Sequence, residues 1–558
     1  MVGQHNRITP GMLSDDIGRR LEIMHRIDDN WHPDIRPWTR KDLAHRAVVV
    51  DSFEAFSGRF DKRLEYIFAD NNEHVGYTAQ LIDRVLNETA ETPPRLIKSR
   101  RPLLKHFYKS PANFFEVNTK DFYLRINPLL NFDIIPSWKK DGTYFNNRRG
   151  LEIRGGLDEK IYFYTNITES QSKFPNYVRE YINENRAVPG SGFFKNHTSR
   201  IFNEADGQDY LLSQGYIGYQ ATKHFGIELG HGRHFIGSGI RSLLLSDFAN
   251  DYFYLSFNTK VWKFQYKNIF AEMSPLTPRD RQGDALLTKK YYVAHYLSLN
   301  LGRNVTFGFF ESVSFARENQ FEFQYLNPVI FYRTIEQGLG SPDNVLIGIT
   351  GKINFAKRFQ LYGQLALDEF KLSELSGEGW WANKFGLQVG LTYIDALGID
   401  NAEITLEGNF VRPFTYSHRD TISNFSHSKQ ALAHPLGSNF AEFIFDFKYR
   451  PSNDWRISLR THFMKYGEDE NSDVSLGNNI LVSTNLRADD YGHTFLQGVQ
   501  STTFLTYFEV SHQIAHNVNI DLLASYRKQD SDDDARDLST IYAGVGLRIN
   551  MGRRVNAF

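Results

Sequence analysis

From about Asp121 to the C-terminus, apolar and polar residues alternate in runs that are each about one strand long. In the run Ala402–Phe410 the apolar residues share one face and the two glutamates share the other, apart from a local slip before Phe410. Because neighbouring side chains of a strand point to opposite faces, this period of two predicts strands whose two faces meet different environments. We identify about eighteen such runs.

The connections between these runs alternate between short and long. Nine connections at one end are long, from about ten to about forty residues, which is typical of extracellular loops. The eight at the other end have only about three to six residues, and an even strand number with tight turns at one end predicts a bacterial outer-membrane barrel. The short connections are Asp158–Lys160, Thr222–His224, Val261–Lys263, Gly302–Asn304, Ala356–Arg358, Asp395–Asp400, Pro451–Asp454 and Ala515–Asn517.

The same alternation would fit a soluble two-sheet protein with its apolar residues inside. Eighteen strands, however, enclose far more lumen than side chains can fill, so the charged face is expected to line a wet interior and the apolar face to meet lipid. Lipid cannot satisfy an open strand edge, which requires a closed sheet. The sequence therefore predicts an all-β transmembrane barrel of about eighteen antiparallel strands, with a small N-terminal α-helical domain.

The N-terminal region shows a helical period instead. Leu13, Ile17, Leu21 and Met24 recur at spacings of three and four, and a fourth helical segment is expected around Leu81–Leu86,. We predict a helical bundle over residues 1–112, periplasmic or plugging the barrel, and an outer-membrane barrel over residues 113–558. An even strand number places both termini on the short-turn, periplasmic side, where the bundle can plug the lumen or lie below it.

Composition narrows the function. Lys+Arg is 64 and Asp+Glu is 65, so no global charge recruits nucleic acid,. The absence of cysteine excludes disulfides and thiol catalysis,. Mean hydropathy is −0.45 and no apolar run has the length of a transmembrane helix,. The stretch Met1–Pro10 lacks the apolar core of a secretory signal, so we expect that the signal peptide was removed earlier,.

Candidate catalytic groups are few. Glu403 and Glu407 lie on one strand, roughly 13 Å apart by strand rise, which exceeds even the spacing of inverting glycosidases, about 6.5–9.5 Å. The trio His224, Glu228 and His234 is spaced too widely along one strand to chelate one ion,. We predict no catalytic residue, no metal site and no cofactor, hence no enzyme. We expect the charged residues of the strands, these glutamates included, to form cross-strand ion pairs in a wet lumen. They are Arg125, Glu152, Arg154, Glu228, Lys352, Asp368, Glu403, Glu407, Asp446, Arg456, Arg460, Glu509, Asp521 and Arg548.

Aromatic residues gather in the long loops Gln171–Asp209, Arg317–Asp343 and Gly377–Asn383. Rings stack on sugar faces while interspersed polar groups bind hydroxyls, so these loops are candidates for a glycan or protein contact. The alternative is that the rings fold the loops into a lid or occupy the interface belt. The candidate ligand-binding residues are Trp380, Trp381, Tyr177, Tyr181, Phe193, Tyr325 and Tyr332.

Four segments together resemble the capsule-assembly Wzi family of outer-membrane barrels, and within it the RemB-type gliding-motility relatives of Bacteroidetes. They are GIELGHGRHFIGSGIRSLLLSDF at Gly226–Phe248, LNPVIFYRTIEQGLGSPDN at Leu326–Asn344, LYGQLALDEF at Leu361–Phe370 and HPLGSNFAEF at His434–Phe443. The resemblance implies a non-enzymatic protein that holds surface polysaccharide at the outer membrane. For the RemB-type relatives it implies motility and surface adhesion instead.

Three functions remain open on these grounds. The first is an outer-membrane barrel that binds or anchors surface polysaccharide or lipopolysaccharide, in contact with outer-membrane lipid, with other outer-membrane proteins as further candidate partners. The second is an accessory or scaffold subunit of a gliding-motility, protein-secretion or barrel-assembly complex. The third is a passive or gated pore, against which the N-terminal bundle argues because it is placed to block the lumen.

Overall fold

The computed structural model describes residues 6–24, 31–56, 62–71, 106–137, 141–158, 160–281, 283–340, 343–375, 377–471 and 473–558. The fourth helix expected around Leu81–Leu86 lies outside these residues. In the part of the chain that is described, no helix is both long and apolar enough to cross a membrane.

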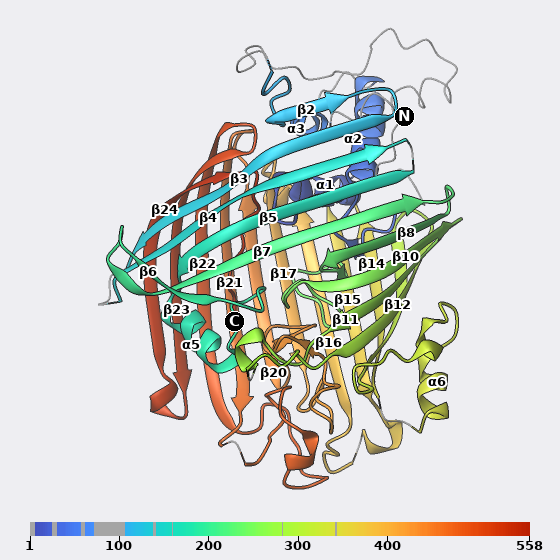
Figure 1. The fold of residues 1–558 in the computed structure, drawn as a ribbon, viewed down its shortest axis with the longest axis vertical. Helices are drawn as coiled ribbons and strands as arrows, with labels where there is room; N and C mark the ends of the chain where they lie inside the picture. Colours follow the sequence, from blue (N-terminus) through green and yellow to red (C-terminus); the bar gives the residue numbers. More distant parts are fainter. Residues whose placement is uncertain are drawn as a thin grey trace.

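The described strands form one closed antiparallel barrel of eighteen strands, as the sequence predicted (Figure 1). The last strand closes the barrel on the first, with Ile549 opposite Leu130 and Val545 opposite Ile134. The barrel strands are β3 (Phe122–Pro136), β4 (Thr143–Leu157), β5 (Ile161–Lys173), β7 (Glu204–Gln220), β8 (Phe225–Gly232), β10 (Tyr252–Val261), β11 (Phe264–Met273), β12 (Lys290–Leu301), β13 (Val305–Phe315), β14 (Asn344–Phe355), β15 (Phe359–Glu369), β16 (Lys384–Ile394), β17 (Ala402–Val411), β20 (Phe440–Tyr449), β21 (Trp455–Glu468), β22 (Val499–Ala515), β23 (Val518–Ser531) and β24 (Leu538–Ile549).

The remaining elements lie at the rims, in the loops and inside the barrel. The helices are α1 (Leu13–Met24), α2 (Arg40–Phe56), α3 (Lys62–Asp70), α5 (Asn176–Asn185) and α6 (Tyr332–Gly338). The short strands are β1 (Ile35–Arg36), β2 (Phe115–Asn118), β6 (Lys195–Ser199), β9 (Phe235–Ile236), β18 (Ser426–His427) and β19 (Gln430–Ala431). Single 3-10 turns are η1 (Pro278–Asp280), η2 (Phe323–Leu326), η3 (Leu372–Glu374), η4 (Ala396–Gly398), η5 (Thr484–Leu486) and η6 (Asp534–Arg536).

All eight predicted short connections are tight turns at one end of the barrel, which we call the short-turn end. The prediction for the opposite, long-loop end was wrong at two places: β3–β4 and β23–β24 are joined by the brief segments 137–142 and 532–537. Strands β3 and β4 each have 15 residues and continue their pairing to Pro136 and Thr143, so their ladder takes up chain that we had assigned to a loop.

The two faces of the wall differ as the alternation predicted. On β17, Glu403, Thr405 and Glu407 are buried inside the barrel, whereas Leu406 is exposed outside. The expected slip before Phe410 is absent, because pairing with β16 and β20 is regular and Gly408 takes the outward position. The outer face is a belt of exposed apolar side chains that includes Ile167, Leu211, Leu229, Phe253, Leu297, Phe307, Ile353, Leu387, Leu406, Phe443, Phe504 and Leu522.

Helices α1, α2 and α3 lie at the short-turn end, at the top of the barrel in Figure 1. They share one apolar core, built from Ile17 and Leu21 of α1, Leu43 of α2 and Ile67 of α3. Gly18 lets α1 approach the segment before α2, since a side chain there would lie 2.3 Å from the Trp38 ring. The periodicity of the sequence therefore corresponds to a small helical cluster with its own core.

The lumen is not simply wet. The loop 233–251 between β8 and β10, the loop 412–439 between β17 and β20, and the tail 550–558 contribute buried residues to an apolar core that also includes inward side chains of the wall. Leu244 shows how closely the loop packs, because a side chain at Gly348 of β14 would lie 2.3 Å from it. In Figure 1 the C-terminus lies within the outline of the barrel. The interior is thus partly a packed protein core.

The sidedness of the barrel can be tested with single cysteines, since the chain has none of its own. We predict that Leu286→Cys, which is 92% exposed between β11 and β12, reacts with an impermeant thiol reagent on intact cells. Asn304→Cys, in a turn at the short-turn end, should react only after the membrane is opened. The reverse pattern would invert the topology.

Candidate functional site: a filled lumen and an aromatic loop face

Charged side chains on the inner wall pair across neighbouring strands. Arg456 of β21 contacts Glu509 of β22 at 3.0 Å, and Arg460 contacts Asp446 of β20 at 2.9 Å. Arg548 of β24 contacts Asp521 of β23 at 3.0 Å. These are cross-strand ion pairs of the kind that the sequence predicted for the aqueous face.

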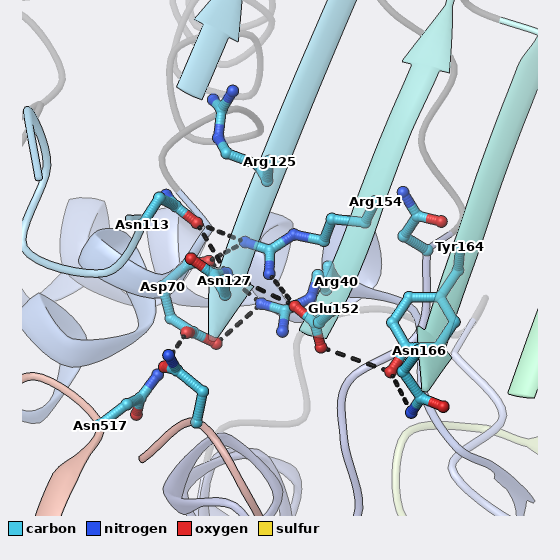
Figure 2. Close-up of polar contacts among 12 residues, drawn as sticks. Arg40, Asp70, Asn113, Arg125, Asn127, Glu152, Arg154, Tyr164, Asn166 and Asn517 are labelled. Carbon is cyan, nitrogen blue, oxygen red and sulfur yellow. Dashed lines mark hydrogen bonds and ion pairs between the residues drawn. The ribbon is translucent and has the colours of Figure 1, made fainter. Parts of the chain in front are cut away.

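A polar network joins the helices to the wall at the short-turn end (Figure 2). The carboxylate of Asp70, at the end of α3, accepts hydrogen bonds from Arg40 of α2 at 2.8 Å and from Asn517 of the β22–β23 turn at 3.2 Å. Arg154 of β4 donates to the Asp70 carbonyl at 3.3 Å and to Glu152 at 2.9 Å. Burial alone would raise the pKa of Asp70, but Arg40 and His516 hold it well below its usual value.

A second anchor lies deeper in the lumen. Lys352 of β14 contacts Glu22 of α1 at 2.6 Å and Asp34 at 2.8 Å, and all three side chains are almost fully buried. Burial would raise the pKa of Asp34, but the ammonium group of Lys352 and the hydroxyl of Ser238 lower it. Asp16 of α1 pairs with Lys448 at 2.8 Å and with Arg456 at 3.2 Å. Helix α1 is therefore held by charges on separate strands of the wall, β14 on one side and β20 and β21 on the other.

Two inward carboxylates hold the inner loop 233–251. Glu407 accepts the backbone N–H groups of Ile240 and Arg241 at 2.7 and 3.0 Å. Glu442 of β20 receives Arg241 at 2.8 Å, and its oxygens lie 2.7 and 2.9 Å from His434 and His462. Glu407 thus has a structural role that explains its presence without glycosidase chemistry.

A cavity of about 480 Å³ remains between α1, the inner loop, the tail and the wall. Its lining is rich in arginine, including Arg19, Arg148 and Arg554, together with Asp15 and Asp247. Burial and the neighbouring guanidinium of Arg233 lower the pKa of Arg554 to about 10. The lining combines these charged groups with apolar residues, and the cavity is far smaller than an open eighteen-stranded lumen,.

The candidate aromatics of the first and second loops are largely loop core. Tyr177 is buried and donates to the Asn556 carbonyl at 2.8 Å, and the Tyr181 ring lies 4.8 Å from that of Phe558. Tyr325 and Tyr332 have no exposed surface. Phe193 is 44% exposed. A ring without exposed surface cannot stack on a sugar, so of these five rings Phe193 is the exposed one and Tyr181 is partly exposed.

The two tryptophans differ in their surroundings. The Trp381 ring has Arg487 at 4.1 Å, Lys384 at 5.1 Å and the Phe414 ring at 5.9 Å, so these side chains pack against it. Trp380 is partly exposed and has Lys371 at 5.6 Å from its ring. Both tryptophans are half-buried; Trp381 packs against two cations and a phenylalanine ring, whereas Lys371 lies beside Trp380.

The structure adds an exposed ring that sequence reasoning missed. The β15–β16 and β21–β22 loops are tied together by backbone hydrogen bonds from Trp381 to Asp490 at 3.0 Å and from Gly492 to Glu378 at 2.7 Å. This brings Tyr491, which is 49% exposed, to the Trp380 loop. We call Lys371, Trp380, Asp490 and Tyr491 the aromatic patch. The spacing of 111 residues between Trp380 and Tyr491 left no signal of their proximity in the sequence.

The trio His224, Glu228 and His234, which we judged from the sequence to be too widely spaced to chelate one ion, has other partners. Glu228 is bonded to Arg7 and Tyr254, while His224 lies in a short turn near the Lys260 carbonyl at 2.7 Å. Across the ranges that the structure describes, no cluster of three or more His, Cys, Asp or Glu is arranged to hold a metal ion.

Comparisons with known proteins support the fold. No protein-family model and no curated protein sequence match the chain. Among solved structures, the Escherichia coli outer-membrane protein Wzi, described as a carbohydrate-binding β-barrel involved in group 1 capsule assembly, is similar with a TM-score of 0.55 and 11% identity, covering 99% of this chain and 100% of Wzi. Pseudomonas aeruginosa OprD has a TM-score of 0.41 and 9% identity over 76% of this chain and 94% of its own. Acinetobacter baumannii OccAB2 has a TM-score of 0.42 and 9% identity over 76% of this chain and 97% of its own.

The likeness to Wzi shows that the chain has the fold of that outer-membrane barrel. At 11% identity it does not establish membership of the Wzi family, and the nearer resemblance to RemB-type relatives stays a prediction. The TM-scores of OprD and OccAB2 are lower, so we draw no conclusion about this chain from those two structures.

The buried lysine anchor can be tested directly. We predict that Lys352→Met leaves Glu22 and Asp34 buried without their cation, which costs about 3–5 kcal/mol. Urea should therefore expose the segment 6–71 to protease at a lower concentration than in the unchanged protein. Lys528→Met, at a lysine that is half exposed in its pair with Asp530, is the matched control and should change little,. Equal resistance of both variants would contradict the anchor.

Proposed function

We propose that this protein is a non-enzymatic outer-membrane barrel that binds or anchors surface polysaccharide, in the manner of a capsule-assembly protein. Residence in the outer membrane is supported by the closed barrel and by its belt of exposed apolar side chains,. The likeness in fold to a carbohydrate-binding barrel of capsule assembly supports the same role.

The observation that carries the proposal is the aromatic patch. An exposed tyrosine and a partly exposed tryptophan lie at the long-loop end, together with Lys371 and Asp490. Rings of this kind offer flat apolar faces to a sugar, and the ammonium and carboxylate groups can bind hydroxyls or charged substituents. The backbone bonds between the two loops fix the rings before a ligand arrives, which lowers the entropic cost of binding.

The N-terminal segment and the inner loop support anchoring rather than transport. Helix α1 is bonded through Arg20 to Asp395, through Asp16 to Lys448 and through Glu22 to Lys352. We propose that residues 1–112 act as a plug at the periplasmic mouth, so that a bound polysaccharide is held at the surface and does not enter the barrel.

The aromatic patch can be tested by binding. In detergent or lipid, the purified protein should bind polysaccharide isolated from the surface of the source bacterium. We predict that Trp380→Ala combined with Tyr491→Ala weakens binding by about ten-fold or more, because anchoring rings at a contact each contribute roughly 2 kcal/mol. Trp262→Ala, which removes a 65%-exposed ring at the short-turn end, is the matched control and should bind normally.

Folding of each variant is checked by the shift in gel migration between unheated and heated samples. Unchanged affinity of the folded double variant would refute the role of the patch. A glycan-independent partner that co-purifies with the protein, and is lost in the double variant, would favour the scaffold function instead.

The plug can be tested by conductance. We predict that the full chain gives no steady conductance steps in a planar bilayer, because α1, the loop 233–251 and the tail 550–558 occupy the lumen. A variant that lacks all three of these segments should conduct, since its charged inner wall is then open to water. Steady conductance of the full chain would contradict the plug and would favour a pore.

A further inference from the structure

Three neighbouring strands carry polar residues on the outer face of the wall, beside residues of the apolar belt. Asn268 of β11 pairs in register with His295 of β12, and His295 pairs with Glu311 of β13. Their outward direction follows from the alternation, since Leu297 and Phe307 on the same faces are exposed to the outside. A carboxylate and two further polar groups facing lipid would be costly without partners.

The β13–β14 connection supplies these partners by folding back over the outer wall. We call its residues 321–338, from η2 to α6, the wall flap. Figure 1 shows α6 beside the strands of the wall, outside the barrel. The carboxylate of Glu311 accepts the backbone N–H groups of Tyr332 at 2.8 Å and Arg333 at 2.9 Å. The Pro328 carbonyl accepts from the Tyr266 hydroxyl at 2.7 Å and from Asn268 at 3.1 Å.

Apolar packing holds the flap against the wall. Tyr325, Tyr332 and Ile335 of the flap form one buried cluster with Val293, Val313 and Phe315 of the strands. The Tyr332 ring lies 3.8 Å from the His295 ring, and the Tyr325 ring lies 4.8 Å from that of Phe315. A bidentate contact of Arg317 with Asp343, at 2.7 Å for both bonds, closes the base of the loop.

The side of the flap that faces away from the wall is apolar at its tip. Phe323 is 76% exposed, Val329 is 79% exposed and Phe331 is 61% exposed. The Phe331 ring lies 6.0 Å from that of Phe309, which is two residues along β13 from Phe307 in the apolar belt. These exposed side chains therefore lie next to the apolar belt of the wall and extend it.

We propose that the wall flap is embedded in the membrane, with Val329 and Phe331 among the acyl chains, instead of standing in water with the other long loops. Irregular backbone is tolerated at membrane depth only where protein satisfies it. Here the polar row of the wall satisfies the flap, because Glu311 and Asn268 bind its backbone, and the flap in turn shields that row from lipid. The occupant of the exposed tip is the same lipid that covers Phe307.

Spin labels can locate the flap. The chain has no cysteine of its own, so a label reacts only with the cysteine that is introduced. Val329→Cys is labelled with a nitroxide in protein reconstituted into phosphatidylcholine vesicles. Collisions with oxygen, which enriches in lipid, are compared with collisions with a water-soluble nickel chelate. Phe307→Cys on the belt and Leu286→Cys in a long-loop-end connection are the lipid and water references.

We expect the label at 329 to match the label at 307, with high oxygen and low nickel collision rates. A label at 329 that matches 286 would overturn the proposal, since the flap would then stand in water. Protection from both reagents would also overturn it, because a protein and not lipid would then cover the tip.

A second variant tests whether the polar row holds the flap. Glu311→Leu removes the acceptor of two backbone N–H groups, so the label at 329 should shift toward the nickel-accessible reference. Glu272→Leu, on the same outward face of β11 and paired with Lys289 at the rim, is the matched control and should leave the label in lipid. An unchanged label in folded Glu311→Leu would overturn the role of the row in seating the flap.

Discussion

Closure of the sheet is the constraint on which the rest of this structure depends. Lipid offers no partner to an open strand edge, so the last strand must return to the first, as β24 does along β3,. Closing eighteen strands leaves a lumen too wide for wall side chains to fill. Everything inside the barrel can be understood as the chain's use of that space.

The chain fills the lumen with segments that the wall is built to hold. Inward charges bind the N-terminal helices, as Lys352 does with Glu22 and Asp34, and inward carboxylates bind the inner loop, as Glu407 does with Ile240 and Arg241. These buried charges therefore have partners from different parts of the chain. This arrangement makes the interior specific, since a segment that lacked those partners would leave buried charges uncompensated.

The long loops lie in three different places, and each place suits a different role. The loop 233–251 enters the lumen, the flap 321–338 lies along the outer wall, and the loops that carry Trp380 and Tyr491 lie at the long-loop end. Loops of the third kind are the ones that can present rings to a polysaccharide, whereas the flap faces lipid in our proposal. In our proposals the aromatic residues of the loops thus serve packing, membrane contact and binding.

By itself the sequence determined the strand number, the eight short turns, the direction of the charged face and the helical start of the chain. These features are local, because a few consecutive residues decide whether a strand or a turn forms. Burial of Tyr325 and Tyr332, the proximity of Tyr491 to Trp380 and the filling of the lumen were decided only by tertiary structure. They depend on where distant loops fold, and alternation within one strand carries no information about that. The outward parity of Asn268, His295 and Glu311 was readable in the sequence, but only the register of three strands aligned them into one row.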